Sequence, residues 1–275
     1  MFTPLSPEAI RRGLVSRSVG HRVVCLGSVG STNDWLKAAA AEGAPEGLAV
    51  FAEEQTVGRG QIGHRWLAPI GCCLLGSVLF RPPFPPERLF ALTMLGACAA
   101  AGAAIELTGL PVQLKWPNDL ISERGKLGGV LTESSSLAGQ VEYAILGIGI
   151  NVNLSRRALS AIPGAASLQA ELGHRVNRNQ LARALLRGID ERYTLLCQGQ
   201  FAAVFSEWRE RLATIGKWVD LRRGPKVEGP CFALQVTDDG GLILERPDGT
   251  TFTAFAGEVS VRTTNGQETQ AACSQ

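Results

Sequence analysis

Apolar residues recur along this chain at two spacings, one typical of helices and one typical of strands. Helical spacing runs through residues 179–196 and 201–212. The longest uncharged stretch, residues 89–105, is diluted by Gly and Ala and is shorter than the roughly 20 apolar residues that span a bilayer, so it predicts a buried helix within 87–108. Short apolar runs predict strands at 22–26, 48–52, 72–80, 112–116, 126–133 and 142–152.

Polar residues mark the starts of two further helices. Ser6 followed by Pro7 predicts an N-cap and a first turn. The polar run 31–34 caps a second helix, which ends at Gly43.

The pattern changes after residue 215, where short alternating runs are separated by Asp-Gly turns. Such spacing is typical of a small β-barrel. We therefore predict a larger domain at 1–214, a barrel at 215–264 and a polar tail at 265–275. Strands of the barrel are predicted at 218–221, 232–236, 242–244 and 251–255.

Composition supports a folded core and excludes strongly charged partners. The chain has 275 residues, of which 45% are hydrophobic and 19% charged, too apolar a balance for a disordered chain. Lys and Arg exceed Asp and Glu by only 27 to 25, and from residue 216 onward six basic residues face eight acidic ones. We therefore expect neither DNA nor a membrane as a partner.

Cysteine and histidine usage is typical of a reducing compartment. The seven cysteines include no Cys-x-x-Cys pair, and the three histidines have no ligand spacing, so we expect reduced thiols and no protein-ligated zinc. The first residues carry Pro and Glu where a signal peptide needs an apolar stretch. We therefore expect a cytoplasmic protein.

Residues 58–66 are rich in glycine and arginine and follow neither period. Closely spaced glycines let backbone N–H groups converge on an anion, and Arg59 and Arg65 can grip a carboxylate or phosphate. The segment is neither a P-loop, because no Gly-Lys-Ser/Thr follows, nor a Rossmann fingerprint, because no helix follows. Taken alone, it is as readily explained as a flexible connection.

Three other segments carry candidate chemistry. In residues 115–119, Pro117 ends a strand, and the Asn-Asp pair after it can meet a ligand or a hydrated Mg²⁺, or simply cap a hairpin. Lys126 begins a strand beside a glycine pair that allows close backbone approach. The alternating glycines of residues 146–153 admit either a flat ligand or a closely packed element.

Taken in order, these segments resemble biotin protein ligase. The resemblance covers roughly residues 28–262 and implies an α+β fold. A mixed sheet flanked by helices, like the catalytic domains of class II aminoacyl-tRNA synthetases and biotin–lipoate ligases, would precede an SH3-like barrel. Fewer than thirty residues precede the first motif, so the short form without a DNA-binding repressor domain is expected. The matching segments are 31–33, 55–66, 115–119, 126–131, 147–151 and 257–262.

The resemblance implies an enzyme that joins biotin to ATP as biotinoyl-AMP. It then transfers biotin to one lysine of the biotin carboxyl carrier protein of acetyl-CoA carboxylase or a related carboxylase. Biotin, ATP and Mg²⁺ are the implied small molecules. Carried over by motif, the catalytic residues are Lys126, Arg59 and Asp119, and Asp119 is also the candidate Mg²⁺ ligand. The biotin residues are Ser31, Thr32, Asn33, Gln55, Gly58, Arg59, Lys126 and Gly129. The nucleotide residues are Gly60, Gln61, Trp66, Asn118, Lys126 and Asn151.

The glycine-rich segment departs from the family pattern at two positions. The family commonly reads Gly-Arg-Gly-Arg-x-Gly-Arg, and here Gln61 and His64 replace the second and third arginines. A histidine carries charge only at lower pH. Loss of a fixed cation at Gln61 predicts weaker retention of biotinoyl-AMP and less selective labelling of lysines.

Two other functions stay open at this point. A lipoate or octanoate protein ligase would share the expected fold and the lysine acceptor. A non-catalytic biotin-binding module is compatible with Gln61 and His64. The resemblance also suggests a homodimer formed side by side, with the strand at 142–151 as its edge.

Overall fold

The computed structural model of the chain describes residues 3–60, 66, 68–223, 226–256 and 260–263. Its larger part contains a seven-stranded mixed sheet with the order β1-β2-β3-β7-β6-β5-β4. β1 pairs in parallel with β2, and the other neighbouring strands are antiparallel. The strands are β1 (Val23–Val29), β2 (Ala49–Gln55), β3 (Cys73–Phe80), β4 (Gln113–Lys115), β5 (Asp119–Ser122), β6 (Gly125–Leu137) and β7 (Gln140–Asn151).

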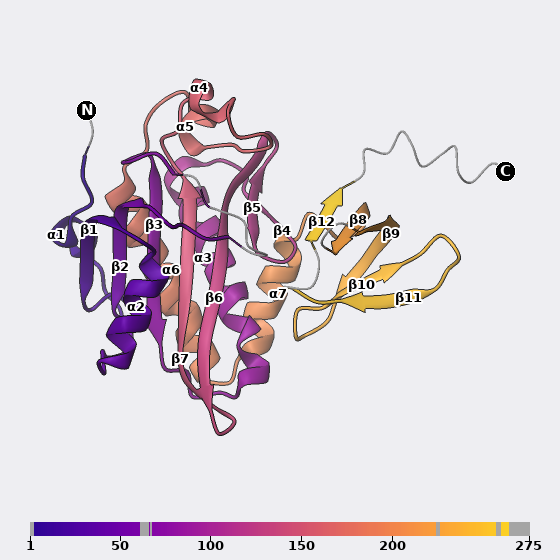
Figure 1. The fold of residues 1–275 in the computed structure, drawn as a ribbon, viewed down its shortest axis with the longest axis horizontal. Coiled ribbons are helices and arrows are strands. Elements are labelled where there is room, and N and C mark those ends of the chain that lie inside the picture. The colour runs from indigo at the N-terminus through magenta and orange to yellow at the C-terminus, as the bar shows by residue number, and fades with distance from the viewer. Residues whose placement is uncertain (1–2, 61–65, 67, 224–225, 257–259, 264–275) are drawn as a thin grey trace.

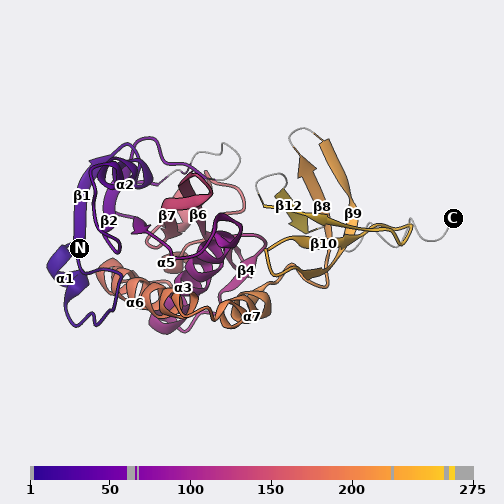
Figure 2. The same ribbon diagram turned by 90° about the horizontal axis from the view of Figure 1, so that it is seen from below.

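Helices cover both faces of this sheet (Figure 1). Figure 2 shows α3, α6 and α7 side by side on one face and α2 on the other. The long helices are α2 (Thr32–Ala41), α3 (Phe90–Thr108), α6 (Arg178–Cys197) and α7 (Phe201–Arg211). The short ones are α1 (Pro7–Arg11), the 3₁₀ turn η2 (Pro86–Arg88), α4 (Arg156–Leu159) and α5 (Leu168–Leu172).

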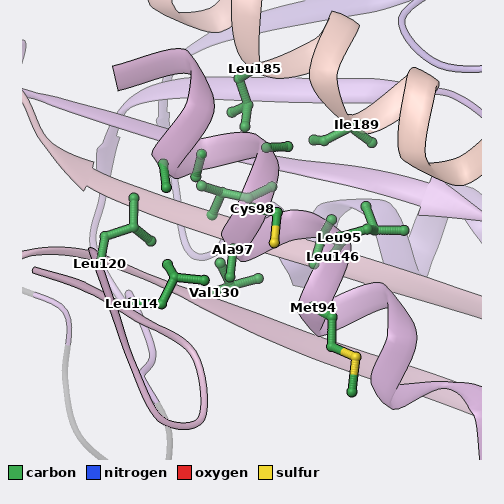
Figure 3. Packing of buried hydrophobic residues seen from close by; sticks show 14 of the residues in the cluster. Met94, Leu95, Ala97, Cys98, Leu114, Leu120, Val130, Leu146, Leu185 and Ile189 are labelled. Carbon is green, nitrogen blue, oxygen red and sulfur yellow. The ribbon is translucent and has the colours of Figure 1, made fainter. Parts of the chain in front are cut away.

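Helix α3 lies at the centre of the core. Figure 3 shows its Cys98 between Val130 and Leu146 of the sheet and Leu185 of α6. Among the described residues, Pro86–Thr108 alone has the length and apolar character of a membrane span, and 72% of its most apolar window is buried inside the fold. Because other elements cover the helix on both sides, its apolar surface is used in packing. The predicted buried helix is confirmed.

Helix α6 fastens the N-terminal segment to the core. The carboxylate of Asp190 accepts the backbone N–H groups of Arg17, Ser18 and Val19 at 2.7–2.8 Å. The buried guanidinium of Arg178 is paired with Glu53 at 2.7 Å. These contacts satisfy polar groups that would otherwise be buried without a partner.

The C-terminal part is a five-stranded antiparallel sheet beside α7, with the order β11-β10-β9-β8-β12 (Figure 1). It is attached to the larger part through Trp116, whose Nε1 donates to the carbonyl of Gly240 at 2.9 Å. The predicted fold class, a mixed sheet with helices followed by a small antiparallel unit, is confirmed. The strands are β8 (Trp218–Arg223), β9 (Lys226–Val236), β10 (Leu242–Glu245), β11 (Thr251–Ala254) and β12 (Ser260–Thr263).

One prediction about the sheet is wrong. The strand at 142–151 was expected to be a free edge, but β7 pairs with β3 over Ala144–Asn151 and with β6 along its length. The edges of the sheet are β1 and β4. A homodimer therefore cannot form by pairing along this part of β7, because its backbone groups are already used.

Candidate functional site

A cavity of about 410 Å³ opens where the start of α2, the end of β2, the turn before β5 and the middle of β6 and β7 meet. The cavity brings together segments that are far apart in the sequence, and both Arg59 and Lys126 line it. The described residues that line it are Ser31, Thr32, Asn33, Gln55, Arg59, Gly60, Trp66, Gly76, Lys115, Trp116, Pro117, Asn118, Asp119, Lys126, Gly129, Val130, Leu131, Gly147, Ile148, Gly149, Asn151, Ile162, Pro163, Gly164, Ala165 and Val261.

A group of buried polar side chains forms one end of the cavity. Gln55, the last residue of β2, accepts from the backbone N–H of Thr32 at 2.7 Å and from its hydroxyl at 3.0 Å. Ser77 of β3 lies 2.7 Å from the Thr32 hydroxyl and donates to Asn33 Oδ1 at 2.6 Å. The first turn of α2 is thereby fixed to the sheet. Hydroxyl and amide groups at this end can hydrogen-bond a small polar ring.

Arg59 is held at the rim of the same end. Its two terminal nitrogens bond both carboxylate oxygens of Asp34 at 2.6–2.7 Å, and one of them reaches Glu133 at 3.3 Å. Lys37 adds a second cation, 2.7 Å from Glu133. Hydrogen bonds from Arg59 hold the pKa of Asp34 below its usual value. A bidentate pair of this kind is among the more directional contacts that arginine makes.

Lys126 forms the cationic centre of the cavity. Its Nζ lies 2.6 Å from Oδ1 of Asp119 on the neighbouring strand. Gly129 stands directly opposite Asp119, and a β-carbon there would lie 3.2 Å from Asp119 and 3.5 Å from Lys126 Nζ. The backbone of Lys126 is fixed by bonds to the segment 164–166, which closes one side of the cavity. An ammonium group held in this way suits an anion bound between strands.

The indole of Trp66 packs against Gly149 of β7. A β-carbon at Gly149 would come within 2.9 Å of its ring, so only glycine leaves this space. The ring centroid is 5.9 Å from Lys126 Nζ, and the backbone N–H of Trp66 donates to Gly58 at 3.0 Å. Its Nε1 is buried without a partner among the described residues. This aromatic face offers a stacking surface next to the cation.

Asn118 and Asn151 fix the walls of the cavity. The side-chain amide of Asn118 donates to the carbonyl of Val130 across the turn before β5. The amide of Asn151 donates to the carbonyl of Ala166 at 3.0 Å. These donors are used within the protein, so the two side chains act on a ligand mainly through the shape and backbone they hold.

Most residues singled out in the sequence line this one cavity. The structure brings Arg59 and Lys126 together there, as expected. Gly58 does not line it and instead packs against Trp66. Gln61 and His64 lie outside the described residues.

Sequence reasoning missed Gly76, Ser77 and the segment 162–165, and it did not name Lys115 or Val261 as site residues although both lie in matching segments. A polar residue inside the otherwise apolar run 73–80 was a signal for Ser77, and Lys115 opens a motif already noted. The segment 162–165 reaches the cavity through loop closure, for which the local sequence carries no signal.

Comparisons with known proteins agree with this geometry. Residues 27–151 match the model of the biotin/lipoate A/B protein ligase family. The chain is 32% identical over 265 residues to the biotin–[acetyl-CoA-carboxylase] ligase of Mycobacterium tuberculosis, covering 93% of this chain and 95% of that protein. It is 32% identical over 263 residues to the bifunctional ligase/repressor BirA of Escherichia coli, covering 93% of this chain and 80% of that protein. Its fold matches that of a biotin protein ligase from Aquifex aeolicus solved with biotin and ATP, with a TM-score of 0.76 and 28% identity. The match covers 89% of this chain and 100% of that one.

Proposed function

The chain belongs to the biotin protein ligases of the biotin/lipoate A/B protein ligase family, and on this premise we propose how its own residues carry out the reaction. Biotin's carboxylate oxygen attacks the α-phosphorus of ATP, and pyrophosphate leaves. The amine of an acceptor lysine then attacks the acyl carbon of biotinoyl-AMP, loses a proton, and AMP leaves. The observation that carries the proposal is that Arg59 and Lys126 line one cavity with the polar end formed by Thr32 and Gln55.

Biotin's ureido ring occupies the polar end of the cavity. Thr32 and Gln55 supply hydroxyl and amide groups, with Ser31 and Asn33 beside them. A pocket built from such groups rejects an analogue that leaves them unpaired, because each unpaired buried group costs free energy. This supports biotin over lipoate, whose dithiolane ring has no hydrogen-bond donor.

Lys126 bridges biotin's carboxylate and the α-phosphate in the first step. Negative charge builds on the phosphoryl oxygens there, and a pre-positioned ammonium stabilises that charge without reorganisation. When these anions bind, the ion pair between Lys126 and Asp119 is broken or shared with them. The adenine stacks on Trp66, and Gly129 leaves room for the adenylate.

Mg²⁺ enters this account with ATP, since it commonly binds through one or two carboxylates together with substrate phosphates. Asp119 is the acidic side chain among the described lining residues, and its carboxylate oxygens are of the type that Mg²⁺ prefers. No group of three or more candidate metal ligands occurs among the described residues. When bound, Mg²⁺ would neutralise phosphate charge.

We propose the biotin carboxyl carrier domain of acetyl-CoA carboxylase as the acceptor, supported by the name of the Mycobacterium tuberculosis relative. Its lysine amine has an ordinary pKa near 10.4 and needs a base to attack at neutral pH. Asp119 is the candidate, once Lys126 has turned to the adenylate. Because ATP and this carrier are required together, a cytoplasmic location is proposed as well.

Gln61 bears on how long the intermediate stays bound. An arginine at this position would add a fixed cation to the glycine-rich segment that follows Arg59. We expect Gln61→Arg to slow release of the adenylate, measured by filter binding of preformed labelled biotinoyl-AMP. Equal release rates in the two proteins would refute this role.

Detection of biotinoyl-AMP tests the proposed function. The protein is mixed with biotin, ATP and Mg²⁺, quenched, and analysed by mass spectrometry, with lipoate and octanoate in parallel samples. We expect biotinoyl-AMP with biotin, and little adenylate with the other two acids. More adenylate with lipoate or octanoate than with biotin would indicate a lipoate or octanoate protein ligase. Biotin binding without any adenylate would indicate a non-catalytic biotin-binding module.

A further inference from the structure

Glu133 lies behind the cavity. It contacts Asn33 and Arg59, which line the cavity, and Lys37 of α2. On β6, Gly129 and Leu131 line the cavity, and Glu133 follows on the same face because side chains alternate along a strand. Thr132, between them, points the other way, to Thr93 of α3 at 2.8 Å. The Glu133 carboxylate therefore faces the start of α2 and the segment that carries Arg59.

Both oxygens of Glu133 are occupied. Oε2 accepts from Asn33 Nδ2 at 2.5 Å and lies 3.3 Å from Arg59, and Oε1 lies 2.7 Å from Lys37. Although burial raises the pKa of Glu133, hydrogen bonds from Lys37 and Asn33 and the nearby cations bring it below its usual value. The group is ionised at neutral pH, and an ionised carboxylate only accepts hydrogen bonds.

This acceptor fixes the orientation of the Asn33 amide. With Nδ2 turned to Glu133, Oδ1 faces Ser77 and accepts its hydroxyl proton at 2.6 Å. The Asn33 side chain packs directly against the backbone of Gly147, since a β-carbon there would lie only 2.5 Å from Oδ1. Glu133 thus turns Asn33 Oδ1, and not the amide nitrogen, toward the Ser77 hydroxyl, which keeps Ser77 in place as a donor.

The chain of hydrogen bonds continues to Thr32. The Ser77 hydroxyl, which Asn33 holds, also donates to Thr32 Oγ1 at 2.7 Å, and Thr32 donates its own proton to Gln55 Oε1 at 3.0 Å. The Thr32 oxygen keeps one lone pair for an N–H of the ligand. A ureido ring carries two such N–H groups.

We propose that Glu133 is a positioning residue that, through Asn33 and Ser77, holds the Thr32 hydroxyl where its oxygen accepts from biotin's ureido N–H. The same carboxylate holds Arg59 and Lys37 beside that end of the cavity. The proposal rests on the proposed function, because it takes biotin's ring as the occupant. Glu133 itself touches no substrate and acts through Asn33.

A double-mutant cycle on biotin binding tests this role. Glu133→Gln keeps the size of the side chain but can donate to Asn33, which leaves the amide orientation undetermined. We expect it to raise the biotin Kd, measured by calorimetry without ATP, by about tenfold. In a Ser77→Ala background the same change should raise Kd by less than about threefold, because the chain it acts through is already broken. The kcat for adenylate formation at saturating biotin should change much less than KM.

Glu142→Gln is the matched control. It removes the same charge from the adjacent strand, where Glu142 is exposed and bonds Ser135. The proposal is overturned, while the ligase function stands, if the biotin Kd of Glu133→Gln equals that of this control. It is also overturned if Glu133→Gln raises the Kd by the same factor in the wild-type and the Ser77→Ala backgrounds. If wild type neither binds biotin nor forms adenylate, the proposed function itself fails. Should Glu133→Gln not fold by circular dichroism, Asn33→Ala breaks the same chain with all charges kept, and an unchanged Kd there overturns the proposal.

Discussion

At the scale of single residues, the site is an arrangement of charges that are already paired before substrate arrives. Lys126 is bonded to Asp119, and Arg59 to Asp34 and Glu133. Paired charges avoid the cost of desolvating an isolated ion. The cations are also held in place, where a substrate anion can bind them. In the proposed reaction, biotin's carboxylate and the α-phosphate replace these internal partners around Arg59 and Lys126.

Replacing Lys126 by alanine removes the cation that we propose faces the reacting oxygens. We expect Lys126→Ala to lower the rate of biotinoyl-AMP formation by about 10²–10³-fold or more, the range found when a charge-stabilising group is removed. Pyrophosphate release in a coupled assay measures this rate. Lys226→Ala, at an exposed position on β9, serves as control and should retain the wild-type rate. Loss of activity in both variants would show that the effect is not specific.

The charged group around Arg59 predicts a dependence of stability on pH. The folded pKa values of Asp34 and Glu133 lie below their ordinary values of 3.8 and 4.5, so both carboxylates stabilise the fold fully above those values. That contribution is lost as the pH falls through the lowered pKa values. We expect wild type to be more stable than Glu133→Gln to urea at about pH 7, with the difference shrinking towards about pH 3. A difference that grows on acidification would contradict these assignments.

At the scale of elements, the cavity depends on strands that lack side chains at chosen positions. Gly129, Gly147 and Gly149 lie on adjacent strands β6 and β7, and each leaves room for a polar or aromatic side chain to lie against backbone. The sheet therefore serves as the floor of the site, with α2 on one side and the segment 162–165 on the other.

A methyl group at Gly149 should disturb the nucleotide side of the cavity alone. Its β-carbon would lie 2.9 Å from the Trp66 ring, so the indole must move. We expect Gly149→Ala to raise the KM for ATP several-fold while the biotin Kd stays unchanged, measured by adenylate assay and calorimetry. Gly102→Ala is the control: its β-carbon meets nothing nearer than 3.9 Å, and it should stabilise α3 by about 0.5–1 kcal/mol without affecting either constant. An unchanged KM for ATP in Gly149→Ala would exclude Trp66 as the stacking surface.

Much of this arrangement could be predicted from the sequence, because apolar period and polar caps are local signals. The buried helix α3, the Ser6 cap and the long strands follow from such signals, and the ordered motifs predicted one shared site. Strand β5 was not predicted, because its four residues are too few to show a period. The interior place of β7 and the role of Ser77 depend on strand order and register, which no local pattern encodes.

At the scale of the whole molecule, the C-terminal sheet forms part of the site. Val261 of β12 lines the cavity, and the ring of Phe90 lies so close to Gly240 that a β-carbon there would clash. Trp116, itself a lining residue, connects the two parts through its bond to Gly240. Movement between the two parts would therefore change the shape of the cavity.

Trp116→Phe should loosen this connection. It leaves the Gly240 carbonyl without its indole donor, and an unsatisfied buried carbonyl costs about 1–3 kcal/mol. We expect a lower melting temperature by differential scanning calorimetry and faster proteolysis of the C-terminal sheet. An unchanged melting temperature would show that the indole bond does not hold the two parts together.

Transfer of biotin to a carrier protein tests the central claim most directly. The protein is incubated with biotin, ATP, Mg²⁺ and a biotin carboxyl carrier domain, and the carrier is then probed with labelled avidin. A carrier whose acceptor lysine is replaced by arginine, and the ligase variant Lys126→Ala, are run beside it. We predict labelling of the intact carrier by the wild-type protein, and none in the two controls. An unlabelled carrier in the presence of folded protein and all substrates would contradict the account.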